Sequence, residues 1–375
     1  MNSLKKPTKV KDRRFMKSAL VLARRGLGTV APNPAVGCVL VAPSGRVVGR
    51  GWTQPGGRPH AETVALDRAG TRARGATAFV TLEPCSHTGK TPPCADALIT
   101  AGVRRVVVAI EDPDKRVSGR GLMRLREAGI DVTLGVMAAE AEELNLGYIT
   151  QRRNGRPLVT LKSATTLDGR IAAHTGESRW ITGPSARRRV HQMRMSHDAI
   201  VVGIGTVLAD DPDLTCRLTG LEDHSPVRVV IDTRLQLPLA SRLVRTASET
   251  PTWIVVSAET ERDRFKAYEE LGVIVIPVSV GQDTHPNPPD VLIELGARGL
   301  TRVLVEGGSL LAAALLRAGL VDRLAWFRAP SVIGGDGVPA IGAFGIDKLS
   351  QTRRLKLLSI ETLGDDRLET YSATD

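Results

Sequence analysis

Cysteines and aromatic residues are scarce in this 375-residue chain, which contains four cysteines and 3% Phe, Trp and Tyr. Four cysteines are too few for the disulfide framework of a secreted protein. No stretch reaches the roughly 18 uncharged apolar residues of a membrane helix, and the first residues, MNSLKK, lack the apolar segment of a secretory signal. We therefore expect a cytoplasmic protein with a core of Val, Leu, Ile and Ala.

The overall composition is that of a folded protein, with 42% hydrophobic and 24% charged residues. There is no low-complexity tract and no fixed-period repeat, which excludes fibrous and solenoid architectures. The length predicts two or three domains of roughly 100–200 residues each. A net charge of +11 favours anionic partners, either nucleic acid or phosphorylated small molecules, and does not choose between them.

Helices and strands are expected to alternate along the first half, which predicts a sheet layered between helices. A basic arm over residues 1–11 precedes a helix at 12–25. Further strands are expected at 36–41, 46–50, 77–82, 105–110 and 131–134, and further helices at 60–69, 95–101, 122–128 and 138–146.

A polar stretch at 151–157 interrupts this pattern, and a new strand at 158–163 follows it. We therefore predict a first domain over 12–150 and a second over 151–375. The second domain has the same alternation and is also expected to be α/β. Its further strands are expected at 199–202, 228–231, 253–256, 273–278 and 302–306.

Four residues of the first half form a metal-site pattern. His60 and Glu62 begin an expected helix, Cys85 follows a strand, and Cys94 begins the next helix. Zinc deaminases that act on nucleobases have the signature H-x-E followed by P-C-x-x-C. The H-x-E part fits, whereas here eight residues separate the cysteines.

One imidazole and two thiolates leave the fourth zinc position to water, whose pKa then falls to about 7. Glu62 is placed to move a proton from that water to a departing amine. The alternative is a structural zinc site, which normally has four protein ligands; His87 is the spare candidate. The ligand count and the adjacent Glu62 favour a catalytic site. Cys38 and Cys216 are interpreted as small buried residues.

The second half has no G-x-G-x-x-G motif, because Gly203-Ile204-Gly205 lacks the third glycine, and a Rossmann domain is therefore disfavoured. Gly307-Gly308-Ser309 follows a strand and precedes an apolar helix at 310–318. Backbone N–H groups at such a turn can receive a phosphate, although by itself the pattern is usually a plain turn.

Six segments resemble those of the bifunctional riboflavin-biosynthesis deaminase/reductase family. They are 32–37 (PNPAVG), 81–94 (TLEPCSHTGKTPPC), 161–170 (LKSATTLDGR), 179–183 (RWITG), 206–212 (TVLADDP) and 305–308 (VEGG). The resemblance implies a cytidine-deaminase-like three-layer domain followed by a dihydrofolate-reductase-like domain. It also accounts for the cysteine spacing, which is that family's own variant.

By this resemblance the chain is a zinc-dependent hydrolase and an NADP-dependent oxidoreductase. The first domain would deaminate 2,5-diamino-6-(5-phosphoribosylamino)pyrimidin-4(3H)-one, and the second would reduce the ribosyl group with NADPH to give 5-amino-6-(5-phosphoribitylamino)uracil. The implied Zn2+ ligands are His60, Cys85 and Cys94, and Glu62 is the proton carrier. Asn33 and Lys90 would contact substrate; Asn33 is equally well interpreted as a turn residue.

In the reductase half the same resemblance implies two sets of contacts. The NADPH contacts are Ala164, Trp180, Thr206, Asp210, Thr233, Gly308 and Ser309, and the substrate contacts are Ser178, Arg194, Leu214, Arg217 and Glu306. Two arginines and a serine hydroxyl suit a phosphate clamp, whereas a lone arginine is more often a solvated surface residue. Lys162 and Asp168 also lie near a strand end, and we leave them outside the catalytic set.

Thr53 and Val64 depart from the family pattern, because many relatives have histidine at both positions. A nucleic-acid-editing zinc deaminase with a nucleic-acid-binding second domain is the main alternative. Such a domain needs exposed aromatics for base stacking, and the chain has only 4 Trp, 3 Tyr and 5 Phe. A scaffold with a decayed site is disfavoured by the intact metal set. We expect a small-molecule enzyme without nucleic-acid or membrane partners, assembled as a homo-oligomer.

Overall fold

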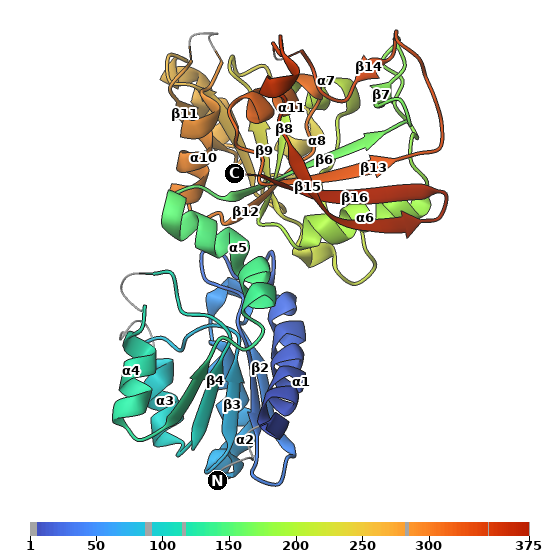
Figure 1. Cartoon of the computed structure of the whole chain (residues 1–375). Coiled ribbons are helices and arrows are strands. Elements are labelled where there is room, and N and C mark those ends of the chain that lie inside the picture. Colours follow the sequence, from blue (N-terminus) through green and yellow to red (C-terminus); the bar gives the residue numbers. More distant parts are fainter. Residues whose placement is uncertain (1–5, 87–91, 115–117, 282–284, 344, 375) are drawn as a thin grey trace. The chain divides into compact units, whose positions relative to one another are not determined.

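The computed structural model describes residues 6–86, 92–114, 118–281, 285–343 and 345–374, with side chains from Val10 onward. The chain forms two compact units, Met1–Asn154 and Gly155–Asp375. Each unit has its own sheet (Figure 1). Among the described helices, none combines the length and apolar character that a bilayer crossing requires.

The first unit has a five-stranded sheet in the order β2-β1-β3-β4-β5. Its strands are β1 (Gly37–Val41), β2 (Val47–Trp52), β3 (Thr77–Val80), β4 (Arg105–Val108) and β5 (Asp131–Leu134). β1 is antiparallel to both β2 and β3, whereas β3, β4 and β5 are parallel. The helices are α1 (Lys6–Ala23), α2 (Ala61–Ala69), α3 (Cys94–Thr100), α4 (Arg120–Glu127) and α5 (Ala138–Asn154).

Glycines in β1 and β2 let two helices approach opposite faces of this sheet. A Cβ on Gly37 would overlap the backbone of α1, and a Cβ on Gly51 would overlap that of α2. Contacts link α1 to α5, and α2 through α3 to α4. The unit is therefore a three-layer α/β/α structure, as expected for a cytidine-deaminase-like domain.

Two helices of this unit are longer than the sequence pattern predicts. α1 begins at Lys6 rather than at residue 12, and α5 ends at Asn154 rather than at 146. The polar residues at 151–154 are thus the last helical turn, and not a linker. Their backbone hydrogen bonds are made within the helix, so polar side chains toward solvent cost little there.

The second unit contains a nine-stranded sheet in the order β11-β10-β9-β8-β12-β6-β13-β16-β15. The strands are β6 (Leu158–Thr165), β8 (Ala199–Gly203), β9 (Val227–Ile231), β10 (Thr252–Ser257), β11 (Ile274–Val278), β12 (Arg302–Val305), β13 (Arg323–Arg328), β15 (Leu355–Leu363) and β16 (Asp366–Ala373). β7 (Arg170–Ala172) and β14 (Val338–Pro339) form a separate two-stranded sheet.

From β11 through β13 neighbouring strands are parallel, whereas β16 and β15 continue the sheet antiparallel. The helices are α6 (Pro184–Met195), α7 (Ile204–Asp210), α8 (Arg242–Arg245), α9 (Lys266–Glu269), α10 (Pro288–Ala297) and α11 (Ser309–Arg317). Buried apolar clusters lie on both faces of the sheet. The five further strands predicted for the second domain are confirmed to within a few residues as β8, β9, β10, β11 and β12. β13, β15 and β16 were not predicted.

Candidate metal centre and cleft of the second unit

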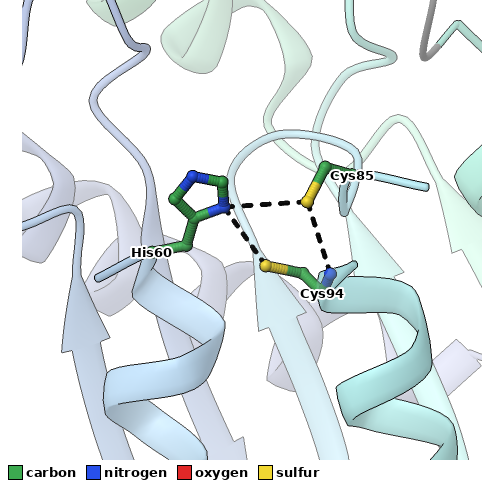
Figure 2. A group of neighbouring side chains, drawn as sticks. All are labelled: His60, Cys85 and Cys94. Carbon is green, nitrogen blue, oxygen red and sulfur yellow. Dashed lines mark hydrogen bonds between the residues drawn. The ribbon is translucent and has the colours of Figure 1, made fainter. Parts of the chain in front are cut away.

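Three elements bring the predicted metal ligands together (Figure 2). His60 is the N-cap of α2, Cys85 follows β3, and Cys94 is the first residue of α3. The imidazole Nδ1 lies 3.3 Å from Cys94 Sγ and 3.7 Å from Cys85 Sγ, and the Cys94 backbone N–H donates to Cys85 Sγ at 3.3 Å. The ligand atoms of all three residues lie within 4.8 Å of one another.

This donor set fits zinc. Tetrahedral bonds of about 2.3 Å to sulfur and about 2.0 Å to nitrogen separate ligand atoms by roughly 3.5 Å, which matches the distances around Nδ1. Hydrogen bonds from Cys94 and His60 outweigh burial and lower the pKa of Cys85 to about 4, so its thiolate form is favoured. Within the described part of the chain the cluster has three ligands. His87, the possible fourth, lies outside the described residues.

Glu62 follows His60 by two residues, in the first turn of α2, and does not belong to the ligand cluster. Its side chain is buried, and desolvation raises its pKa to about 7. His60, Glu62, Cys85 and Asn33 all line one cavity of about 90 Å³. Two of the predicted ligands, the predicted proton carrier and one predicted substrate contact thus share a single cavity.

The loop that carries Asn33 is fixed by side chains from two distant elements. Asn145 of α5 accepts a hydrogen bond from the Ala35 N–H at 3.0 Å and donates to the Ala35 carbonyl at 3.1 Å. Thr53 accepts from the Val36 N–H at 3.0 Å and donates to the Pro34 carbonyl at 3.1 Å. These bonds hold the Asn33 amide at the cavity wall.

Residue types alone did not predict a role for Glu83, although it lies in the same segment as Cys85. Its buried carboxylate accepts from the N–H groups of Asp112, Gly119, Gly121 and Leu122 at 2.9–3.3 Å. It thereby ties the end of β3 to the loop before α4. Glu83 also lines the cavity, as do Asp112, Tyr148 and Arg152.

The second unit has a cleft of about 1460 Å³. It lies at the carboxyl ends of the parallel strands β8, β9 and β12, which is the usual ligand position in such sheets. Every predicted cofactor and substrate contact of this half lines the cleft: Ala164, Ser178, Trp180, Arg194, Thr206, Asp210, Leu214, Arg217, Thr233, Glu306, Gly308 and Ser309.

A charged cluster lies in the wall of this cleft. The Arg194 guanidinium donates to both carboxylate oxygens of Glu306, at 2.8 and 3.0 Å, and to the Thr215 carbonyl at 2.9 Å. Lys162 Nζ lies 3.8 Å from Glu306 Oε2. Burial would raise the pKa of Glu306, but Arg194 and Lys162 outweigh it and lower that pKa to about 2.

The cluster qualifies one expectation and adds one residue. The Arg194 guanidinium on α6 already pairs with Glu306 after β12, so a substrate phosphate would compete with that carboxylate, and the predicted contact of Arg194 stays a prediction. Lys162, which was left outside the predicted set, lines the cleft beside that carboxylate, and burial lowers its pKa.

Other side chains of the cleft make local contacts. Arg217 is 53% exposed and pairs with Asp213 at 3.3 Å, and Asp210 pairs with Arg179 at 3.3 Å. Trp180 is 67% exposed, with the Arg187 guanidinium 4.5 Å from its ring centre. Asp168 lies outside the cleft lining.

Asp168 accepts from Thr166 Oγ1 at 2.6 Å and from the Gly334 N–H at 2.7 Å, so it anchors a turn.

Comparisons with known proteins agree with both sites. The family model described as "Cytidine and deoxycytidylate deaminase zinc-binding region" matches residues 9–110, and that described as "RibD C-terminal domain" matches residues 157–368. The riboflavin biosynthesis protein RibD of Escherichia coli (strain K12) is 44% identical over 368 residues, covering 95% of this chain and 98% of the relative. This chain belongs to the RibD family.

Solved RibD structures extend the likeness to the whole chain. A form of Acinetobacter baumannii RibD has a TM-score of 0.88 and 37% identity, covering 98% of this chain and 100% of that one. A Thermotoga maritima protein described as a diaminohydroxyphosphoribosylaminopyrimidine deaminase/5-amino-6-(5-phosphoribosylamino)uracil reductase has a TM-score of 0.85 and 35% identity, with the same coverage. The chain is therefore a bifunctional RibD-family deaminase and reductase of riboflavin biosynthesis.

Three further positions of this RibD-family chain bear on the site. Thr53 is buried and fixes the Asn33 loop, so the position supports the pocket through its hydroxyl. Val64 is half-buried on α2, near the position of Gly51 in β2. Lys90, the other expected substrate contact of this unit, lies outside the described residues.

Proposed function

We propose that this chain deaminates 2,5-diamino-6-(5-phosphoribosylamino)pyrimidin-4(3H)-one and then reduces the product with NADPH to 5-amino-6-(5-phosphoribitylamino)uracil. The description of the Thermotoga maritima relative names both activities. The observation that carries the proposal is the cavity shared by His60, Glu62, Cys85 and Asn33. It combines a three-donor metal site with a carboxylate outside the ligand set.

In the first unit, His60, Cys85 and Cys94 would hold zinc. When bound, zinc supplies a water of lowered pKa for attack at the carbon that bears the 2-amino group. The buried Glu62 carboxylate takes a proton and delivers it to the departing amine. The Asn33 amide, held by the loop contacts of Asn145 and Thr53, donates to and accepts from the pyrimidine edge.

In the second unit, the cleft would hold NADPH and the deaminated substrate together. Hydride transfer needs no side-chain nucleophile, only a nicotinamide held close to the sugar carbon. The predicted NADPH contacts at Thr206, Thr233 and Gly308 follow the ends of β8, β9 and β12. Arg217 remains the proposed phosphate contact, because its exposed pair with Asp213 costs little to exchange.

The remaining assignments follow from the same scheme. We propose a deaminase domain that ends with α5 and a reductase domain that follows it, a homo-oligomeric assembly, and no nucleic-acid partner. The last point is supported by the low aromatic content of the chain, with 4 Trp, 3 Tyr and 5 Phe, since base stacking needs exposed aromatic side chains. A cytoplasmic location is supported by the four free cysteines.

The test is to incubate the purified full chain with the diaminopyrimidine phosphate, with and without NADPH. Ammonia release should require bound zinc but not NADPH, whereas loss of NADPH absorbance should require prior deamination. Removal of zinc with a chelator should stop ammonia release and leave reduction of the deaminated intermediate unchanged. Absence of ammonia release by the zinc-loaded chain would overturn the proposal.

A further inference from the structure

A fully buried arginine of the second unit is held by uncharged oxygen atoms. Arg228 is the second residue of β9, and its side chain is buried beside α8 (Figure 1). Among the described residues its guanidinium donates to five oxygens, none of which belongs to a carboxylate. Burial lowers its pKa to about 10, so the group is still charged at neutral pH.

The two nitrogens at the end of this guanidinium bind different parts of the fold. Nη2 donates to three carbonyls in or just after α8, those of Leu243, Thr246 and Thr250, at 3.1, 3.0 and 2.6 Å. Nη1 donates to Thr246 Oγ1 at 2.8 Å and to the Asp213 carbonyl at 3.3 Å. The Asp213 contact is the one of these five that lies outside the α8 region. Arg228 therefore connects α8 to the chain around Asp213.

Residues 211–217, the segment around Asp213, have an unfavourable backbone conformation. Asp211 has a φ of 39° and Leu214 a φ of 54°. Residues with a side chain rarely adopt positive φ, and they keep it only where the surrounding structure enforces it. The conformation of this segment must therefore be stabilised by contacts from other elements.

Contacts from two helices hold the ends of the 211–217 segment. At one end Arg194 of α6 donates to the Thr215 carbonyl at 2.9 Å. At the other end the Arg242 backbone N–H of α8 donates to Asp211 Oδ1 at 2.9 Å. The Arg242 side chain also pairs with Asp211, but it is 53% exposed, and exposed ion pairs contribute little. Arg228 supplies a buried contact to the middle of the segment.

The same segment forms part of the wall of the reductase cleft. Leu214 and Arg217, two of the proposed substrate contacts, line the cleft, whereas Arg228 lies behind them and does not line it. The Asp213 carbonyl accepts from Arg228, and the Asp213 carboxylate pairs with Arg217 at 3.3 Å. Asp213 thus links the buried guanidinium to the exposed one.

We infer that Arg228 is a positioning residue of the reductase, which holds the 211–217 segment in the conformation that presents Leu214 and Arg217 to the substrate. Arg228 does not itself touch the substrate. The inference rests on the proposed reduction of the deaminated intermediate. It concerns the affinity for that intermediate and not the hydride step, because the proposed NADPH contacts that follow β8, β9 and β12 lie outside the segment.

The test is steady-state reduction of the deaminated intermediate by the full-length chain, with Arg228→Lys as the first variant. Lysine keeps the charge but has a single nitrogen, which cannot occupy the positions of both Nη1 and Nη2. The KM for the intermediate should rise about fivefold or more, whereas kcat and the KM for NADPH should stay within about twofold of the parent. Arg245→Lys, a matched change at an exposed arginine of α8, should leave all three parental.

A second pair of variants leaves the buried charge in place. Thr246→Val removes the hydroxyl that accepts from Arg228 Nη1 at nearly constant side-chain volume, and Thr246→Ser retains a hydroxyl. Thr246→Val should raise the KM for the intermediate about threefold, and Thr246→Ser should keep it within about 1.5-fold of the parent. Far-UV circular dichroism and ammonia release check that each variant is folded.

A parental KM for the intermediate in both Arg228→Lys and Thr246→Val would overturn the inference. A matching change in kcat and in both KM values would also overturn it, because a merely structural role affects all three. If Arg228→Lys does not fold, the comparison of Thr246→Val with Thr246→Ser decides. A parent that fails to reduce the intermediate would instead overturn the proposed reductase function, so the two failures are distinguishable.

Discussion

Replacement of Glu306 by Gln tests the charged cluster of the reductase cleft. The Glu306 side chain is only 8% exposed and accepts two hydrogen bonds from Arg194, with Lys162 close to the same oxygen. The substitution keeps the shape and leaves two buried cations without a counter-charge. We expect it to lower the free energy of unfolding by about 3–5 kcal/mol at neutral pH.

The pH dependence follows from the pKa of Glu306, which is about 2 in the folded chain and near its ordinary value when unfolded. The difference of about two and a half units corresponds to about 3 kcal/mol. Because the folded pKa is depressed, this stabilisation is complete above the unfolded pKa and is lost as the pH falls toward 2.

Urea unfolding followed by tryptophan fluorescence measures both quantities, since Trp180, Trp253 and Trp326 all lie in the second unit. The difference in the free energy of unfolding between parent and Glu306→Gln should shrink as the pH falls from about 5 to about 2. Glu270→Gln, at a 66% exposed carboxylate, should change stability by less than about 0.5 kcal/mol. A Glu306→Gln variant within about 1 kcal/mol of the parent at neutral pH would refute the reasoning.

Three further substitutions test the two sites. Glu62→Gln should abolish ammonia release while elemental analysis still finds zinc, and deamination at the parental rate would exclude Glu62 as the proton carrier. Glu83→Gln should lower the free energy of unfolding by about 2–4 kcal/mol, because an amide replaces a carboxylate that accepts hydrogen bonds from four N–H groups. Denaturant titration of the metal-loaded protein measures this change, and a variant as stable as the parent would contradict it. Trp180→Ala should raise the KM for NADPH about fivefold or more with unchanged stability, and an unchanged KM would remove Trp180 from the NADPH contacts.

The sequence predicted the parallel strands well, because strands such as β8 and β10 are buried on both faces and therefore contain uninterrupted apolar runs. It failed for β15, where most side chains are exposed and the bulge breaks the alternation. The end of α5 was also misplaced, because polar residues at the end of a helix resemble those of a linker.

For the metal centre, the motif was sufficient to select His60, Cys85 and Cys94, which the structure brings together, and Glu62, which lines one cavity with His60 and Cys85. The choice of Nδ1 as the nitrogen that faces the cysteines depends on the ring orientation, which residue spacing does not encode. The sequence did not reveal that Arg194 pairs with Glu306, because the two residues are 112 positions apart in the chain. Pairings of that kind arise only from the tertiary fold.

The position of α5 has a practical consequence for expressing the two units separately. Asn145 and Tyr148 of this helix support or line the deaminase cavity, although they follow every residue of the zinc motif. A fragment terminated after residue 146, where the apolar periodicity fades, would retain all three metal ligands but lose the Tyr148 wall. We therefore expect that an autonomous deaminase fragment needs α5 up to Asn154, and that a separately expressed reductase would begin at Gly155.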